Sequence, residues 1–555
     1  MAIRHGVLIA CVFCPLVATD PIQGPMAFLA DGKAVGVALS GGVRGFFGLP
    51  FAEPPIGGLR WRRPVSNRPW GNATYNATQV KPQCLQAKGG DEDCLYLNVF
   101  APAACTKKSS CAVMFWIYGG GYVGGSAIDE GGQILPQRHG VILVSANYRL
   151  NIFGFLGSSE LRARATAGGG TGNYGLLDQR MAMVWVQRNI ASIGGDPSRV
   201  FIVGESAGAG SVTNHVIMPG SWGLFSRAGM ESGSFSQFDS AFGMEQAEGT
   251  YACVLKYSRC ANTDCLLKLA SSELADIAQK VIAACSKAEY YFQPSIDGVD
   301  IVGEPWKLAR SGIVAPNVTF LFGSNREDAV PTHIPLPTCT HVCSEQDFRS
   351  WLNSTLSYGH VGLGVANASQ IAYAMDLYSR EPQTDPSGPY RRFSKWYWAS
   401  KHVLSDTQKL CSARRAARWL SKKAATYLYW FTRVATTEWG TGDGCYHGAE
   451  IFFVFGWVFS GVSEELQLSS DMGTFWTNMA IHGYPSSDKS WPKYDKADDV
   501  LLQMDVASAS SGGLKPVAHV RTDFCDFWDT LLYQSDPSAS TSMMQEESSQ
   551  EITLV

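Results

Sequence analysis

Five short runs of apolar residues recur along the chain, and they constrain its fold more than any other feature. They cover residues 112–118, 141–148, 199–204, 318–323 and 426–432. Each run is apolar continuously rather than at alternate positions, which is typical of strands covered on both faces of a mostly parallel sheet. The stretch at 176–195, between the second and third runs, carries apolar residues at helical spacing and ends at two glycines. Strand, helix and strand in succession predict an α/β fold.

The organisation of the chain points to one domain. Its 555 residues could form several domains, but they contain no internal repeat and no long low-complexity linker. We therefore expect a single domain with long insertions over residues 20–534, built on a large, mostly parallel central sheet flanked by helices. Reactive groups in such sheets gather at the carboxyl ends of the strands. The loops that follow Tyr118, Val203 and Phe322 are therefore the candidate sites of chemistry.

Ser206 stands in the stretch RVFIVGESAGAGSV, where an apolar run ends and small residues able to open a helix follow. A sharp turn from strand to helix would lift its hydroxyl clear of the backbone, and such a turn needs small neighbours, here Gly204 and Gly208. The partial positive charge at a helix N-terminus would favour an oxyanion. In a chain with 57 glycines, however, Gly-x-Ser-x-Gly arises easily by chance. The partner residues must decide whether Ser206 is a nucleophile.

A serine nucleophile needs a base, and the base needs a group that orients it. In the chain order serine, acid, histidine, His447 is the best base, because it lies in a glycine-rich loop after the last apolar run. His360 and His402, by contrast, follow no strand-like run. For the acid, Glu327 and Asp328 both come just after the fourth run, although two adjacent carboxylates could equally form a solvated turn.

A glycine-rich segment directly after the first apolar run suits a third task. Ester hydrolysis requires donors for the developing oxyanion, and glycines supply backbone N–H groups without side chains in the way. Three successive glycines, Gly119, Gly120 and Gly121, are unfavourable for a hairpin turn but allow the backbone to approach a substrate closely. Two of their amides could join that of Ala207.

The first residues predict secretion. Arg4 and His5 precede a short apolar run that reaches small residues near residue 19, which is typical of a signal peptide over residues 1–19 and is too short to span a bilayer. Secretion predicts glycans and oxidised cysteines. The candidate glycosylation sequons stand at Asn72, Asn76, Asn317, Asn353 and Asn367. The Ser-rich, acidic segment 535–555 is predicted to be a disordered tail.

Charge and cysteine spacing narrow the choice of partners. A net charge of -4 gives no basic surface for nucleic acid, and the apolar run at 451–462 is too short for a membrane span. No cysteine array has zinc spacing, so the thirteen cysteines after the signal peptide are interpreted as disulfides with one thiol left over. We expect no nucleic acid, no stable membrane insertion and no metal.

Longer strings extend these motifs: EDCLYLNVF, WIYGGGYVGGS, NYRLNIFGFLG, GNYGLLDQRMAMVWVQRNIASIGGDPSRV and GESAGAGSV. Through them the chain resembles the type-B carboxylesterase and cholinesterase family over nearly its whole mature length. The resemblance implies an α/β-hydrolase fold, a small-molecule ester substrate and no cofactor.

The resemblance also implies roles for single residues. Ser206 matches the nucleophile and His447 the base. The acid of the family stands sixth in a G-x-N-x-x-E string, and GSNRED puts Asp328 there, an aspartate where glutamate is usual. The loop must therefore approach His447 more closely, or Glu327 must substitute. The implied oxyanion donors are Gly120, Gly121 and Ala207.

The substrate pocket departs from the cholinesterase pattern. In cholinesterases the disulfide matching Cys84 and Cys94 encloses a tryptophan that stacks on choline, whereas here the loop is only LQAKGGDED and holds no aromatic residue. Without an aromatic face the cation–π contribution is lost, so acetylcholine is not expected to be the preferred substrate. Glu205 could attract a cation or be a structural carboxylate. Phe235 and Phe238 fall where the family builds its acyl pocket, or belong to the core.

The resemblance further implies disulfides between Cys84 and Cys94 and between Cys411 and Cys525. Cys265 should pair with Cys260 or Cys253. Two local pairs carry no support from the family, namely Cys105 with Cys111 and Cys339 with Cys343. Cys445 is the candidate for the free thiol.

These observations together predict a secreted serine ester hydrolase that acts through an acyl-enzyme. One alternative is a lipase for long-chain lipid esters, which the short loop between Cys84 and Cys94 disfavours as a lid. Another is a non-catalytic, cholinesterase-like adhesion protein, which would be expected to lack one or more of the three catalytic residues.

Overall fold

The computed structural model describes residues 24–128, 132–166, 168–236, 241–285, 291–329, 336–357, 366–381, 393–438, 444–458, 461–507 and 513–534. The predicted signal peptide at 1–19 and the predicted tail at 535–555 lie outside these ranges. So does Phe238. The domain bounds at 20 and 534 stay a prediction.

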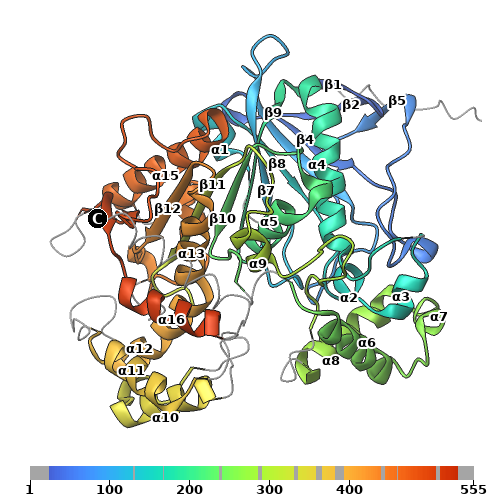
Figure 1. Cartoon of the computed structure of the whole chain (residues 1–555). Coiled ribbons are helices and arrows are strands. Elements are labelled where there is room, and N and C mark those ends of the chain that lie inside the picture. Colours follow the sequence, from blue (N-terminus) through green and yellow to red (C-terminus); the bar gives the residue numbers. More distant parts are fainter. Residues whose placement is uncertain are drawn as a thin grey trace, which may run out of the picture.

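An 11-stranded sheet runs through the middle of the molecule (Figure 1). Its strands, from one edge to the other, are β14 (Lys515–Ala518), β13 (Val500–Met504), β12 (Thr426–Phe431), β11 (Thr319–Asn325), β10 (Arg227–Glu231), β9 (Gly195–Glu205), β7 (Cys111–Ile117), β8 (Ile142–Ala146), β6 (Tyr96–Pro102), β4 (Val43–Pro50) and β3 (Val37–Leu39). From β13 to β8 every neighbouring pair is parallel, and the pairs toward both edges are antiparallel. A smaller sheet joins β1 (Met26–Leu29), β2 (Gly32–Val35) and β5 (Gly71–Asn76).

The five apolar runs form β7, β8, β9, β11 and β12, so the predicted α/β fold with a mostly parallel sheet is confirmed. The helical stretch is α4 (Tyr174–Ile193), which ends at Gly194 with a left-handed φ of 97°. Two strands of the parallel part were not predicted, β10 and β13.

Two sets of helices cover the sheet. The helices α4, α5 (Ala207–Ile217) and α13 (Cys411–Leu420) pack on β9 to β12, and α1 (Ile134–His139) and α15 (Ser463–His482) pack on β6 to β9. In Figure 1, α6 to α8 and α10 to α12 form separate groups beyond the sheet. The remaining helices are α2 (Asn151–Phe155), α3 (Ser159–Ala163), α6 (Met244–Ser258), α7 (Thr263–Leu266), α8 (Ser271–Cys285), α9 (Pro305–Arg310), α10 (Glu345–Ser357), α11 (Ala368–Ser379), α12 (Lys395–Ser405), α14 (Ala449–Val454) and α16 (Thr522–Gln534). Within the described ranges, none of the helices combines the length and the apolar character that crossing a membrane requires.

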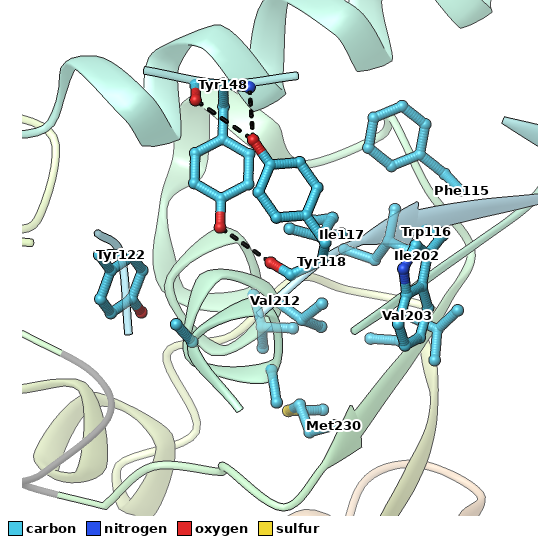
Figure 2. Close-up of a cluster of buried hydrophobic side chains, with 14 of the residues drawn as sticks. Phe115, Trp116, Ile117, Tyr118, Tyr122, Tyr148, Ile202, Val203, Val212 and Met230 are labelled. Atoms are coloured by element: carbon cyan, nitrogen blue, oxygen red, sulfur yellow. Dashed lines mark hydrogen bonds between the residues drawn. The ribbon is translucent and has the colours of Figure 1, made fainter. Parts of the chain in front are cut away.

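Figure 2 shows buried side chains around the central strands, among them Tyr118, the residue that precedes the glycine-rich loop. The rings of Tyr118 and Tyr148 stack with centroids 4.4 Å apart, and both side chains are buried. Tyr148 donates its hydroxyl to the Tyr118 carbonyl at 2.8 Å, and the Tyr118 hydroxyl contacts the Tyr148 backbone in return. The residue before Gly119 is thereby fixed on both its main chain and its side chain.

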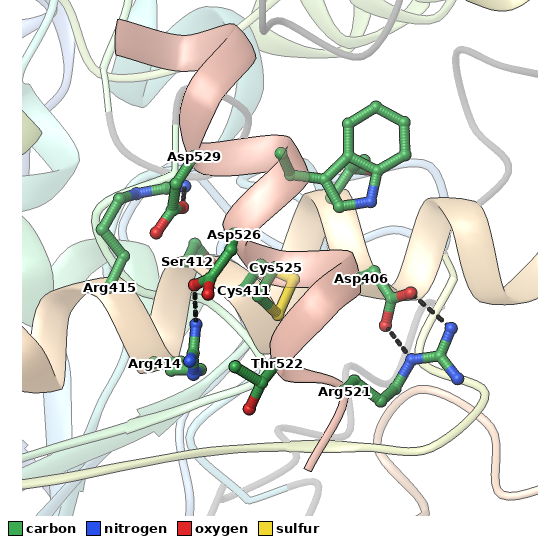
Figure 3. The surroundings of a disulfide bond; sticks show 12 residues. Asp406, Cys411, Ser412, Arg414, Arg415, Arg521, Thr522, Cys525, Asp526 and Asp529 are labelled. Atoms are coloured by element: carbon green, nitrogen blue, oxygen red, sulfur yellow. Dashed lines mark hydrogen bonds and ion pairs between the residues drawn. A yellow bond between two sulfur atoms is a disulfide. The ribbon is translucent and has the colours of Figure 1, made fainter. Parts of the chain in front are cut away.

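The described residues contain six disulfides. They join Cys84 to Cys94, Cys105 to Cys111, Cys253 to Cys285, Cys260 to Cys265, Cys339 to Cys343 and Cys411 to Cys525. The last one ties α13 to α16 and closes a loop of 114 residues (Figure 3). A loop of that length corresponds to about 4–5 kcal/mol in the chain-entropy description of disulfide stabilisation. Cys445 is buried with a free thiol.

Candidate active site

Ser206 sits at the turn between β9 and α5. Its backbone takes φ 57° and ψ -124°. These angles belong neither to a strand nor to a helix, and they are unusual for a residue other than glycine. A Cβ atom added at Gly204 or Gly208 would lie 2.4 Å or 2.0 Å from the carbonyl oxygen of Ile117. The strained turn therefore exists only because both neighbours are glycine, as the sequence pattern predicts.

The structure brings Ser206, His447 and Asp328 together. The Nε2 atom of His447 lies 2.8 Å from the Ser206 Oγ, and its Nδ1 atom lies 2.6 Å from the Asp328 Oδ1. Asp328 is fully buried, and its second carboxylate oxygen accepts the Asn325 N–H at 2.8 Å. The shorter aspartate thus reaches the imidazole ring, although 119 residues separate the two in the sequence.

Glu327 turns away from His447. One of its oxygens accepts from Arg326 at 2.8 Å and lies 3.0 Å from the Nε2 of His402, and the other accepts the Cys445 N–H at 2.7 Å. Burial would raise the pKa of Glu327, but Arg326 and then His402 outweigh it and lower the pKa to about 2. Of the two adjacent carboxylates, only Asp328 contacts His447 within the described part of the chain.

The glycine-rich loop passes directly beside Ser206. A Cβ atom at Gly119 would lie 3.1 Å from the Cβ of Ser206. Gly120 and Gly121 adopt left-handed φ values of 99° and 62°, which turn the chain sharply after β7. Ala207 opens α5, where the backbone N–H groups point out of the helix N-terminus. These are the places where the sequence predicts oxyanion donors, and the roles stay predictions.

Gln86 braces this loop and was not singled out in the sequence. It lies in the short loop between Cys84 and Cys94 and is buried. Its side-chain amide donates to the Gly125 carbonyl at 2.9 Å and accepts the Gly125 N–H at 3.0 Å. No motif signals this residue, because its function depends on a contact across 39 positions.

We expect Gln86→Ala to lower kcat for a short ester by about 10-fold and to change KM little, because small misplacements of catalytic groups are costly. The substitution leaves both polar groups of Gly125 without their partner, so the melting temperature should also fall. Steady-state kinetics and thermal melting measure both effects. Gln467→Ala, on an exposed turn of α15, is the matched control. An unchanged kcat in Gln86→Ala would show that the brace does not shape the site.

Three further buried carboxyl groups surround the Ser206 turn, and only Glu205 was singled out in the sequence. The Glu205 Oε1 lies 3.2 Å from the Nε2 of His447. Glu231 accepts the indole N–H of Trp476 at 2.6 Å, and Glu450 accepts the hydroxyl of Ser232 at 3.2 Å. Glu450 is the second residue of α14 and stands three positions after His447, and this short spacing was the only signal in the sequence that could have marked it.

Burial shifts the protonation of two of these groups. It raises the pKa of Glu205 well above its usual range, and the neighbouring carboxylates of Glu450 and Asp328 raise it further. Burial, followed by the charge of Asp328, raises the pKa of Glu450 to about 7. Burial therefore disfavours the anionic form of Glu205, whose oxygen lies beside the same ring nitrogen of His447 as the Ser206 hydroxyl.

Phe235 lies in the core. It is 1% exposed, and its ring packs 6.5 Å, centroid to centroid, from that of Phe322 on β11. This supports the core alternative for Phe235. The described contacts of Phe235 give it no direct approach to Ser206.

Known proteins similar to this chain are esterases, in agreement with the geometry of the site. The sequence model of the carboxylesterase family matches residues 28–528. Acetylcholinesterase 1 of Caenorhabditis elegans is 31% identical over 542 residues, which cover 88% of this chain and 84% of that protein. Acetylcholinesterase of Bungarus fasciatus is 32% identical over 530 residues, which cover 89% of this chain and 84% of that one. A solved structure of a PNB esterase superposes with a TM-score of 0.75 at 28% identity, covering 91% of this chain and 100% of the other.

Proposed function

The chain belongs to the carboxylesterase family, and from this premise we propose that it hydrolyses carboxylic esters through Ser206, His447 and Asp328. The predicted family resemblance is confirmed, and membership makes the protein a serine ester hydrolase. One observation carries the assignment of residues: an unbroken line of contacts from the Ser206 Oγ through both ring nitrogens of His447 to the Asp328 carboxylate.

The proposed reaction begins with the transfer of a proton. With its Nδ1–H donated to Asp328, the ring of His447 presents an unprotonated Nε2, which takes the hydroxyl proton of Ser206 as the oxygen attacks the ester carbonyl. Asp328 stabilises the imidazolium ion that forms. The N–H groups of Gly120, Gly121 and Ala207 hold the oxyanion.

Collapse of this tetrahedral intermediate breaks the bond to the alcohol, which leaves with the proton from the Nε2 of His447. Ser206 is then esterified by the acyl group. A water molecule gives a proton to the Nε2 and attacks the acyl carbonyl, and a second collapse releases the carboxylic acid and restores the Ser206 hydroxyl. All the steps use the same three side chains and the same oxyanion donors.

The electrostatics of the site favour an uncharged alcohol over choline. A cationic alcohol needs an aromatic face or an anionic carboxylate nearby. The loop enclosed by Cys84 and Cys94 contains no aromatic residue, and burial raises the pKa of Glu205 well above its usual range, which weakens this carboxyl group as a partner for a cation. We therefore propose that choline esters are poor substrates here, although two relatives are named acetylcholinesterases.

A series of nitrophenyl esters tests the function and its acyl preference. We expect hydrolysis with kcat/KM highest for short acyl chains, because the short loop LQAKGGDED between Cys84 and Cys94 provides little material for a lipase lid. A burst of nitrophenol equal to the enzyme concentration would reveal the acyl-enzyme. A maximum of kcat/KM at long acyl chains, enhanced by an emulsion interface, would identify a lipase. Absence of hydrolysis would favour the hypothesis of a non-catalytic adhesion protein.

We further propose that the protein is secreted and glycosylated. Six disulfides are stable in oxidising compartments, which is consistent with the predicted signal peptide. All five sequons have exposed asparagines, as glycosylation requires; they are Asn72, Asn76, Asn317, Asn353 and Asn367.

A further inference from the structure

Glu327 joins the two loops that carry Asp328 and His447. Its backbone N–H donates to the Cys445 carbonyl at 3.1 Å, and its carboxylate accepts the Cys445 N–H at 2.7 Å. Cys445 stands two positions before His447, and Glu327 stands next to Asp328. These two hydrogen bonds therefore fix the distance from the Asp328 carboxylate to the imidazole ring of His447.

His402 on α12 holds the carboxylate of Glu327 from the other side. Its Nε2 lies 3.0 Å from the Glu327 Oε1, and its Nδ1 lies 3.2 Å from an oxygen of Glu381. The side chain is only 14% exposed. Each ring nitrogen faces a carboxylate oxygen, Nε2 through a hydrogen bond and Nδ1 through an ion pair, and this arrangement favours the imidazolium ion, in which both nitrogens carry a proton.

The contacts continue to the C-terminal helix. Glu381 also pairs with Arg521 at 2.7 Å, and Arg521 forms two bonds of 2.7 Å with Asp406 (Figure 3). Positive and negative groups therefore alternate from Glu327 to the start of α16. Because α16 is tied to α13 by the disulfide between Cys411 and Cys525, this end of the chain of contacts is rigidly anchored.

We propose that His402 is a positioning residue for ester hydrolysis: while its ring is protonated, it holds Glu327, and through Glu327 the loops of Asp328 and His447, in register. The proposal rests on the function proposed above. A neutral ring carries one N–H and no charge between two buried carboxylates, so one of them loses the His402 contact and the ring no longer screens the two anions from each other. A shift of Glu327 in response would be passed to the His447 loop, to which it is bonded.

The charges around His402 support this protonated state. Burial alone would lower its pKa, but Glu381 and Glu327 outweigh burial and raise the pKa to about 9. Among the described residues, these two carboxylates are its only ion-pair partners. Arg326 and Arg521 pair with Glu327 and Glu381 from the other side. The other charged groups on α12 and on the helices packed against it are Lys395, Lys401, Glu345, Asp347, Arg349, Asp376, Arg380, Asp406 and Lys409.

The first test compares wild type with His402→Gln. We expect kcat of the wild type to fall as the pH rises through about 9, with KM nearly constant. In His402→Gln, kcat at pH 7.5 should be about 10-fold lower with a similar KM, and the alkaline fall should be absent, because the titrating group is gone. His482→Gln, at the exposed end of α15, is the matched control and should keep the profile of the wild type.

A second variant separates positioning from general damage. Glu381→Gln keeps the histidine but removes one of its two anions, so the alkaline fall should move to lower pH by about 1 pH unit or more. The Cys445 thiol does not account for the fall, since burial raises its pKa well above the usual range. An alkaline fall that survives in His402→Gln, or stays in place in Glu381→Gln, would overturn the proposal. An unchanged kcat in His402→Gln at pH 7.5 would do the same.

The melting temperature gives a readout that does not require esterase activity. With a raised pKa, the His402 contact stabilises the fold fully below about pH 6.5 and loses its effect as the pH rises through about 9. The wild type should therefore melt higher than His402→Gln at pH 7, and the difference should shrink as the pH rises through about 9. A difference as large at pH 10 as at pH 7 would disprove the ionic link, whereas absence of ester hydrolysis in the wild type would disprove only the proposed function.

Discussion

Replacement of Ser206 by alanine should reduce kcat/KM for a short nitrophenyl ester by about 10⁵-fold, to the residual level that binding and oxyanion donors alone provide. Alanine removes the oxygen that lies 2.8 Å from the Nε2 of His447, and with it the acceptor of the acyl group. The burst of nitrophenol should disappear as well. Loss of both signals is the largest effect expected from any single substitution in this chain.

The fold should survive this change. Ser206 lies at a turn that Gly204 and Gly208 make possible, and alanine is smaller than serine, so the melting temperature should move by only a few degrees. Ser198→Ala, an exposed position on the same strand β9, controls for the loss of a hydroxyl and should keep full activity. If Ser206→Ala keeps a tenth of the activity or more, another nucleophile carries the reaction and the proposed triad is wrong.

The central sheet was predictable where a strand is apolar throughout. β10 was not, because Arg227 and Glu231 stand at its ends and Gly229 in its middle. Gly229 is required by packing: a Cβ atom there would lie 2.7 Å from the ring of Phe201 on β9. Glu231 is buried on account of Trp476, which is far away in the sequence. Tertiary contacts of this kind override the local pattern.

The proposed site was predictable where a local motif carries the geometry. The turn at Ser206 packs so closely against the Ile117 carbonyl that residues 204 and 208 must be glycine, and the glycines reveal it. The choice between Glu327 and Asp328 was different in kind, because it depends on which distant side chain meets which carboxylate. His402 follows no strand and was set aside as a base, yet its position on α12 places it against Glu327 and away from His447. The contact between His402 and Glu327 could not be predicted from their positions in the sequence.

Asp328→Asn is expected to lower kcat by about 10⁴-fold with little change in KM. An asparagine amide can donate toward the Nδ1 of His447, which favours the tautomer whose proton sits on Nε2 and so removes the acceptor for the Ser206 hydroxyl. It also stabilises the imidazolium ion less. Because Asp328 is fully buried and its other oxygen accepts the Asn325 N–H, water cannot readily replace the carboxylate.

Glu327→Gln is the matched comparison, since it makes the same chemical change one position earlier. Its carboxylate contacts Arg326, His402 and the Cys445 N–H instead of the imidazole of His447. We expect a loss of about 10-fold in kcat, because the substitution loosens the His447 loop but leaves the tautomer of His447 intact. A larger loss at Glu327 than at Asp328 would exchange the two roles. It would mean that the contact of 2.6 Å between Asp328 and His447 does not determine which nitrogen of the ring carries the proton.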